Sequence, residues 1–287
     1  MILSSGIASL KSLVGIDIRV KIVDVGASPV DGPPPYADLI RGGIADVVGF
    51  DPDPGAQRSL AASKGASEIY LPHAIADGRR HELHICALPG MTSLLTPNPD
   101  VLRLFHGFPD WGRVIAVEPI DTMRLDDVPE TAGLDLLKID IQGAELMAFR
   151  NAEARLAEAL VIQTEVEFLP LYVDQPLFGD VDIFLRSRGF ALHKFTDLAS
   201  RVVVPMLRNN DIYAGMSQLA WADAVYVRDI TRLDALSGRQ LLTMATILHD
   251  CYASFDLVMH LLVHHDARFA TGLAGPYLAG LQAAGNR

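Results

Sequence analysis

The chain is poor in cysteine, in basic residues and in long apolar runs, and each shortage excludes a class of protein. Cys86 and Cys251 are the two cysteines among 287 residues, which excludes a disulfide framework and favours a reducing, cytoplasmic location. The 24 basic and 35 acidic residues give a formal net charge of -11, so neither a nucleic acid nor an anionic membrane is an expected partner. Apolar runs fall short of the roughly 20 residues of a membrane-spanning helix. Residues 1–6 lack the features of a signal peptide.

The pattern that is present belongs to an α/β protein. Strands alternate with helices along most of the chain, which predicts a doubly wound, Rossmann-like, mostly parallel sheet. Two late strands and an Ala/Leu-rich helical region follow, so we expect a domain over 1–228 and a helical C-terminal extension over 229–287. Strands are expected at 20–26, 45–50, 68–75, 81–88, 113–118, 134–140, 160–167, 190–195 and 222–228, and helices at 36–41, 55–64, 143–159 and 181–188.

The run that ends at Asp140 is the most informative stretch. It reads as a strand buried on both faces, followed by a turn containing glycine and then by a helix. Ligands of open α/β sheets bind outside the carboxyl ends of the strands, so Asp140, Gln142 and Glu145 are expected at the mouth of a site. The alternative is that Asp140 only caps the following helix.

The first strand ends in a second candidate site, residues 24–28, which contain Asp24, Gly26, Ala27 and Ser28. A glycine directly after a parallel strand permits a tight turn and a close approach to a ligand. The second and fifth positions after Gly26 are not glycine, so the dinucleotide fingerprint is missing and NAD is disfavoured. A nucleoside ligand without a pyrophosphate does not need that fingerprint. A plain turn after the strand is the alternative.

Two further strand ends carry acids that suit a nucleoside. Asp51 ends the second strand, where a carboxylate can accept from both ribose hydroxyls, while Asp53 is expected in the turn or as a helix cap. After the third strand, Ala76 leaves room for a flat ring and Asp77 can accept from the exocyclic amine of adenine. Asp77 with the glycine after it is also a common turn pair.

These strand ends, together with further motifs, resemble the FkbM family of S-adenosylmethionine-dependent methyltransferases. The resemblance covers roughly residues 20 to 195 and implies the seven-stranded class I methyltransferase sheet, with one antiparallel strand among the last two. It implies S-adenosylmethionine at Asp24, Gly26, Ala27 and Ser28 (methionine end), Asp51 and Pro52 (ribose), and Ala76 and Asp77 (adenine). The matching stretches are 49–54, 89–95, 137–145, 163–172 and 175–178, with Asp182, Gly189 and Phe190.

The sequence departs from the family pattern at two places. The second-strand acid of the family is often Glu, and Asp51 is one methylene shorter. Ser28 and Pro29 replace the glycines of the broader methyltransferase pattern. The resemblance also implies the acceptor class, since family members commonly methylate hydroxyls of sugars and secondary metabolites.

Acidic residues at neighbouring strand ends are the candidates for the chemistry. Glu165 and Glu167 are two apart on a strand and therefore point to the same face, next to Asp140. O-methylation requires a hydroxyl to lose its proton, and Glu165 is the expected base, with Tyr172 lining the acceptor pocket. A divalent metal on Asp140 and Glu165 would do the same, but further ligands are not evident, so we expect no metal. The alternative is that one Glu caps a loop and the other holds an arginine.

The sequence thus predicts an enzyme that O-methylates a small hydroxylated molecule or sugar. The C-terminal helices are expected to form a homodimer or to cover the acceptor site. The alternatives are a non-catalytic binding or scaffold protein that kept the fold and, less favoured, an NAD-dependent oxidoreductase. Trp111 and Trp221 are expected to be structural.

Overall fold

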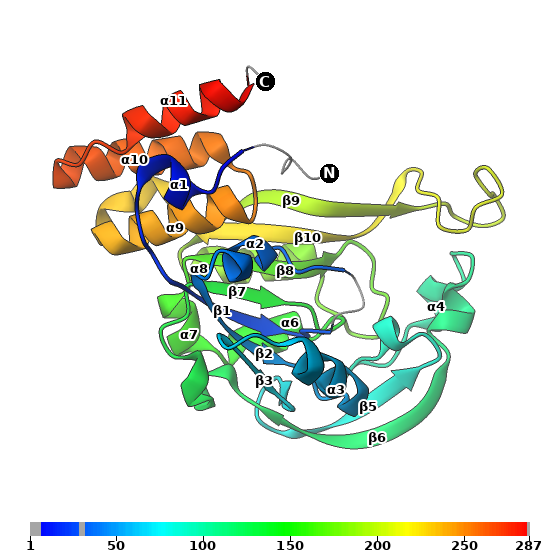
Figure 1. Cartoon of the computed structure of the whole chain (residues 1–287). Helices are drawn as coiled ribbons and strands as arrows, with labels where there is room; N and C mark the ends of the chain where they lie inside the picture. Colours follow the sequence, from blue (N-terminus) through cyan, green and yellow to red (C-terminus); the bar gives the residue numbers. More distant parts are fainter. Residues whose placement is uncertain (1–6, 29–31, 286–287) are drawn as a thin grey trace.

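The computed structural model describes residues 7–28 and 32–285 (Figure 1). Residues 1–6, which were predicted not to be a signal peptide, lie outside the described residues. Pro29 of the first loop lies outside them too. Within them, none of the helices combines the length and the apolar character needed to cross a membrane.

Seven strands form the main sheet, in the order β3-β2-β1-β7-β8-β10-β9 (Figure 1). Strand β10 is antiparallel to both of its neighbours, whereas the pairs on the β3 side of β8 are all parallel. This arrangement confirms the predicted class I methyltransferase sheet with one antiparallel strand. The strands are β1 Val20–Val25, β2 Ala45–Phe50, β3 Glu68–Leu71, β7 Leu136–Ile139, β8 Val161–Glu167, β9 Phe190–Arg201 and β10 Gln218–Arg228.

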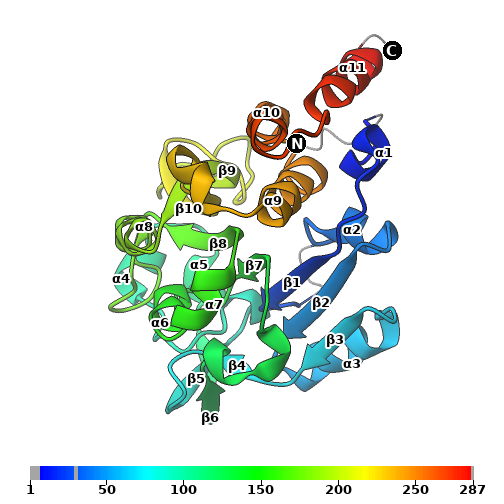
Figure 2. The ribbon, with the colours of Figure 1, turned by 90° about the vertical axis from the view of Figure 1, so that its left-hand side faces the viewer.

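Helices cover both faces of this sheet (Figures 1 and 2). Successive strand residues point to opposite faces, so apolar runs such as Ile22-Val23 and Leu136-Leu137 supply two separate cores. One core packs against α6 Glu145–Arg150, α7 Glu153–Glu158 and α8 Phe178–Ser187. The other packs against α1 Leu10–Val14, α2 Ala37–Arg41, α9 Gly238–Asp250, α10 Phe255–Phe269 and α11 Ala274–Gly285. The boundary at 228/229 remains a prediction, although α9 to α11 share this core with the sheet.

Two expected elements are divided in the structure. The strand expected at 68–75 becomes β3 and β4 Ala74–Ile75, because Pro72 lacks the N–H that would continue the ladder. Strand β4 joins β5 Arg80–Cys86 and β6 Val114–Met123 in a small second sheet. The helix expected at 143–159 is divided into α6 and α7, where the Asn151 side chain donates to the carbonyl of Met147 and ends the first helix.

A third, smaller core lies beneath the segment between β5 and β6. It combines Met91, Phe105 and Phe108 with Leu171 and Tyr172 from the loop after β8. The long β9–β10 hairpin reaches this region, where the backbone of Val204 donates to the carbonyl of Leu104. The segment between β5 and β6 contains α4 Pro99–Leu102 and α5 Phe108–Trp111. Helix α3 Pro54–Ser63 lies near β3. Short 3-10 helices are found at Pro89–Met91, Leu125–Asp127, Pro129–Thr131 and Ile230–Ala235.

Candidate active site

A cavity of about 1210 Å³ opens at the carboxyl ends of β1, β7 and β8. Parallel strands bring their carboxyl ends to one edge, so acids far apart in the sequence meet there. Of the residues predicted from the sequence, Asp24, Gly26, Ala27, Ser28, Asp140, Gln142, Glu165 and Tyr172 line the cavity. Asp51, Pro52, Ala76, Asp77 and Glu145 are not among its lining residues.

Gly26 fixes how closely the first loop approaches the end of β7. Its φ of 82° lies in the left-handed region, and an added Cβ would overlap the carbonyl oxygen of Asp140. The backbone N–H groups of Gly26 and Ala27 both donate to the carbonyl of Phe50, at 2.9 and 3.0 Å. A close approach was expected between this loop and a ligand. The structure shows that the loop also approaches the backbone of Asp140 closely.

Asp24 lies on the cavity floor in a buried ion pair that the sequence analysis missed. It is 2% exposed, and its Oδ1 lies 3.1 Å from Nζ of Lys138, its direct partner in the β1–β7 register. Tyr36 donates to the other carboxylate oxygen. Burial lowers the pKa of Lys138, but the charges of Asp24 and Asp140 outweigh burial and raise the pKa overall. The lysine within an otherwise apolar strand was the available signal.

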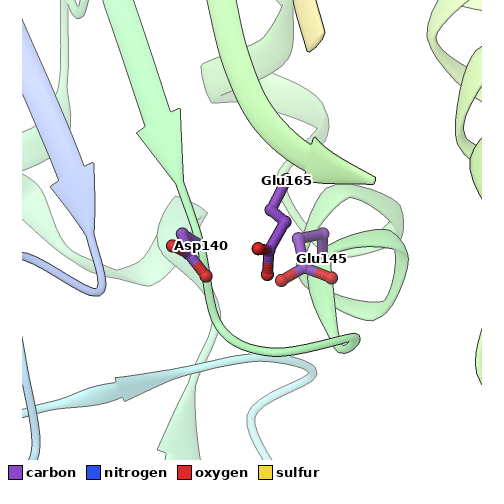
Figure 3. Close-up of side chains that lie close together, drawn as sticks. All are labelled: Asp140, Glu145 and Glu165. Atoms are coloured by element: carbon purple, nitrogen blue, oxygen red, sulfur yellow. The ribbon is translucent and has the colours of Figure 1, made fainter. Parts of the chain in front are cut away.

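Asp140, Glu145 and Glu165 point toward one another at the end of β7 and β8 (Figure 3). One carboxylate oxygen of each lies within 4.8 Å of the others. The side-chain amide of Gln142 donates to both Asp140 and Glu165, at 2.9 Å each. The Tyr172 hydroxyl lies 3.2 Å from the amide oxygen of Gln142 and 3.2 Å from the carbonyl of Met91, two acceptors that share its one proton. Gln142 has a φ of 58°, a strained conformation that the sequence did not reveal.

Burial and crowding favour protonated acids in this cluster. Burial, followed by the charge of Asp140, raises the pKa of Glu165 well above its ordinary value. The same two causes raise the pKa of Glu145 to about 7, although the backbone N–H groups of Ile141 and Gly143 oppose the shift. Both shifts favour the protonated forms of Glu145 and Glu165.

The structure assigns local roles to the remaining predicted acids. Asp53 caps α3 by accepting from the backbone of Ala56 at 2.7 Å, as expected. Asp51 accepts from the backbone of Asp53 at 2.8 Å, and burial raises its pKa. Asp77 accepts from the backbone of Arg79 at 3.0 Å and lies 2.7 Å from His81 Nε2. The turn role of Asp77 is thus present, and the nucleoside contacts of Asp51 and Asp77 remain predictions.

Aromatic side chains that were expected to be structural line the far end of the cavity. Trp111 stacks on Tyr213 with ring centroids 5.4 Å apart, and Phe108 lies between Trp111 and Trp221. Neither tryptophan lies in one of the motifs discussed above, so the sequence did not reveal that it lines the cavity. Both tryptophans border the cavity, and their structural role stays a prediction.

Solved structures with weak likeness to this chain are methyltransferases. A precorrin-6y C5,15-methyltransferase from Geobacter metallireducens is 11% identical over 76% of this chain and 85% of its own, with a TM-score of 0.36. A 16S rRNA (adenine(1408)-N(1))-methyltransferase from Catenulisporales acidiphilia is 12% identical over 76% and 91%, also with a TM-score of 0.36. The strand order and the single antiparallel strand β10 identify the fold. No curated protein matches the chain.

A family model for the methyltransferase FkbM domain matches residues 24–192. This span is more than half of the 287 residues. It begins at the end of β1 and runs past the acidic ends of β7 and β8, so it contains the whole cluster of Figure 3. The chain belongs to the FkbM methyltransferase family.

Proposed function

We propose that this protein transfers a methyl group from S-adenosylmethionine to a hydroxyl of a small molecule or sugar. The observation that carries the proposal is the convergence of Asp140, Gln142 and Glu165 beside the first loop, within one cavity. Family membership supports methyl transfer, while the donor and the accepting atom belong to the proposal.

The residues of the first loop fit S-adenosylmethionine. Gly26, Ala27 and Ser28 have small or no side chains, so their backbone borders the cavity directly. The acidic residues that line the same cavity favour a cationic sulfonium. Asp51 ends the strand adjacent to β1, where a ribose would be held. S-adenosylmethionine, when bound, supplies an electrophilic methyl and leaves as S-adenosylhomocysteine.

Glu165 is the group placed to take the proton of the acceptor hydroxyl. As the oxygen–methyl bond forms and the sulfur–methyl bond breaks, the hydroxyl proton passes to the Glu165 carboxylate. Gln142 positions that carboxylate through its amide, and Tyr172 positions Gln142. The rest of the rate enhancement comes from aligning the acceptor hydroxyl with the methyl group.

A divalent cation is the competing way to activate the hydroxyl. The sequence offered two carboxylates for it, and the structure adds Glu145 as a third. Carboxylate oxygens are suitable ligands for Mg²⁺, and such a cation would acidify a bound hydroxyl. The prediction of no metal therefore stays a prediction, which a chelator tests.

The proposal is tested by binding and by transfer. Calorimetric titration is expected to show binding of S-adenosylhomocysteine and none of NADH. Incubation with methyl-labelled cofactor and cell-extract metabolites is expected to place the label on hydroxyl oxygens. Failure to bind S-adenosylhomocysteine would favour the scaffold alternative, and label on nitrogen or carbon would refute O-methylation.

Replacing Asp51 by Ala is expected to weaken S-adenosylhomocysteine binding by about 1.5–3 kcal/mol, the scale of a hydrogen bond to a charged group. Calorimetry on the folded variant measures the change. Asp53→Ala is the matched control, because Asp53 caps α3 and makes no predicted ligand contact. It should lower the free energy of unfolding by about 1 kcal/mol and leave the affinity unchanged. Equal affinity in Asp51→Ala would remove Asp51 from the site.

A further inference from the structure

Arg201 ends β9 at the aromatic end of the cavity and has an unused buried donor. Its guanidinium carbon lies 4.4 Å from the ring centroid of Trp221, and one terminal nitrogen donates to the carbonyl of Ser200 at 2.9 Å. Its buried Nε has no hydrogen-bond partner in residues 7–28 and 32–285. Within the same residues, Arg201 makes no ion pair of 4.0 Å or less.

Arg228 shows what a purely structural arginine looks like in this chain. It also lies over an aromatic ring, 4.3 Å from the centroid of Phe190. Its guanidinium, however, donates to four carbonyls, those of Leu156, Ala157, Ala159 and Arg188. Burial lowers the pKa of both Arg201 and Arg228, yet Arg201 lacks the acceptors that satisfy Arg228. A buried donor without a partner destabilises a fold, and with one hydrogen bond to Ser200 the Arg201 guanidinium keeps terminal N–H groups for an acceptor from a ligand.

The surroundings of Arg201 are flat and apolar. Phe108 lies against Trp111 and Trp221, with centroids 5.1 and 6.3 Å away, and Tyr213 stacks on Trp111 with an interplanar angle of 10°. The small third core beneath them holds these rings in position. Such faces favour a planar or sugar ring whose own face can lie flat.

The strand register sets the separation between Arg201 and the chemical centre. Trp221 pairs with Glu167, and Asp223 pairs with Glu165, across the antiparallel β10 and β8. Paired residues share a face, and two residues span about 7 Å along a strand. Measured along the strands, Arg201 therefore lies beyond Glu165 by about the length of one ring or more. Burial, with the charges of Glu145 and Asp140, raises the pKa of the intervening Glu167 well above its ordinary value.

We propose that the acceptor carries an oxyanion, a carboxylate or a phosphate, that Arg201 binds while the acceptor's ring lies against the aromatic side chains at that end of the cavity. The hydroxyl to be methylated is then at the opposite end of that ring. The position of the hydroxyl rests on the proposed function, whereas recognition of the oxyanion rests on Arg201 and its aromatic neighbours.

The test measures binding of small probes in the presence of S-adenosylhomocysteine. Both tryptophans of the chain line the cavity, so their fluorescence reports occupancy directly. We expect 4-hydroxybenzoate or phenyl phosphate to bind at least about 10-fold more tightly than the neutral 4-hydroxybenzamide, as expected for a charge-assisted hydrogen bond. The stronger of the two anions identifies the acceptor's oxyanion as carboxylate or phosphate.

Variants separate Arg201 from general charge effects. Arg201→Met is expected to abolish the preference for the anion and to keep affinity for S-adenosylhomocysteine, and Arg201→Lys to retain part of the preference. Arg208→Met, at an exposed arginine in the same hairpin, removes the same charge and should keep the preference. Equal binding of 4-hydroxybenzoate and its amide, no saturable response to either anion, or a preference that survives Arg201→Met would overturn the proposal.

The same experiment separates this inference from the proposed function, because it needs no methyl transfer. An Arg201-dependent preference for the anion supports the inference even where no label reaches a hydroxyl. Label transfer to neutral acceptors, without any such preference, supports the proposed function and refutes the inference.

Discussion

Replacing Glu165 by Gln is expected to lower methyl-transfer turnover by about 10²–10⁴-fold and to leave S-adenosylhomocysteine affinity nearly unchanged. The amide keeps the size of the side chain and still offers an oxygen to Gln142, but it cannot accept the hydroxyl proton. Steady-state turnover and calorimetry measure the two effects. Glu167→Gln is the matched control, because Glu167 lies two residues further along the same face and should lose much less turnover.

The raised pKa of Glu165 gives this prediction a pH signature. The base must be ionised, so kcat/KM should rise with pH on a limb well above the ordinary value of 4.5. That limb should disappear in Glu165→Gln. A turnover close to that of the parent, with the same pH profile, would exclude Glu165 as the base. Loss of activity with a chelator and recovery with Mg²⁺ would instead assign the role to a cation at Asp140, Glu145 and Glu165.

Stability follows from the same shift. When folding raises the pKa of a carboxyl, its contribution to the stability of the native state is fully present at a pH below the pKa of the unfolded chain. This contribution is lost as the pH rises through the pKa of the folded state. Glu165→Gln has no such loss. Its midpoint in urea should therefore equal or exceed that of the parent at pH 8, with the difference vanishing below pH 4.5.

Replacing Lys138 by Met is expected to lower the free energy of unfolding by about 3–5 kcal/mol, because it leaves a buried carboxylate without its counter-charge. Asp24 is 2% exposed and has Lys138 as its ion-pair partner among the described residues. Urea denaturation measures the loss. The double variant Asp24→Asn, Lys138→Met should recover much of it, since the uncompensated charge is gone. A loss below about 1 kcal/mol, or additive effects in the double variant, would show that the pair does not hold the cavity floor.

The sequence alone was sufficient for the family, the sheet and the convergence of Asp140 and Glu165. Asp140 and Glu165 could be placed together because parallel strands end at one edge, and the structure brings both to the cavity. Asp53 could be identified as a cap because turn chemistry is local. These predictions depended on local patterns and on general rules for parallel sheets, which do not require knowledge of the rest of the fold.

Features that depend on register or on distant segments could not be predicted. The pairing of Asp24 with Lys138 follows from the β1–β7 register, and the pairing of β4 with β6 in a second sheet joins segments far apart in the chain. Trp111 and Arg201 line the same cavity because an inserted segment and a long hairpin fold against one another. No local pattern contains that information.

The helices α9 and α10 carry a consequence for biosynthesis. They cover one face of the sheet through Leu241, Leu248 and Leu261, although they follow every strand in the chain. A nascent chain that has just completed β10 therefore presents that apolar face to water and to chaperones. The strands that carry Asp140 and Glu165 are synthesised early, but their final packing waits for α9 and α10 to leave the ribosome.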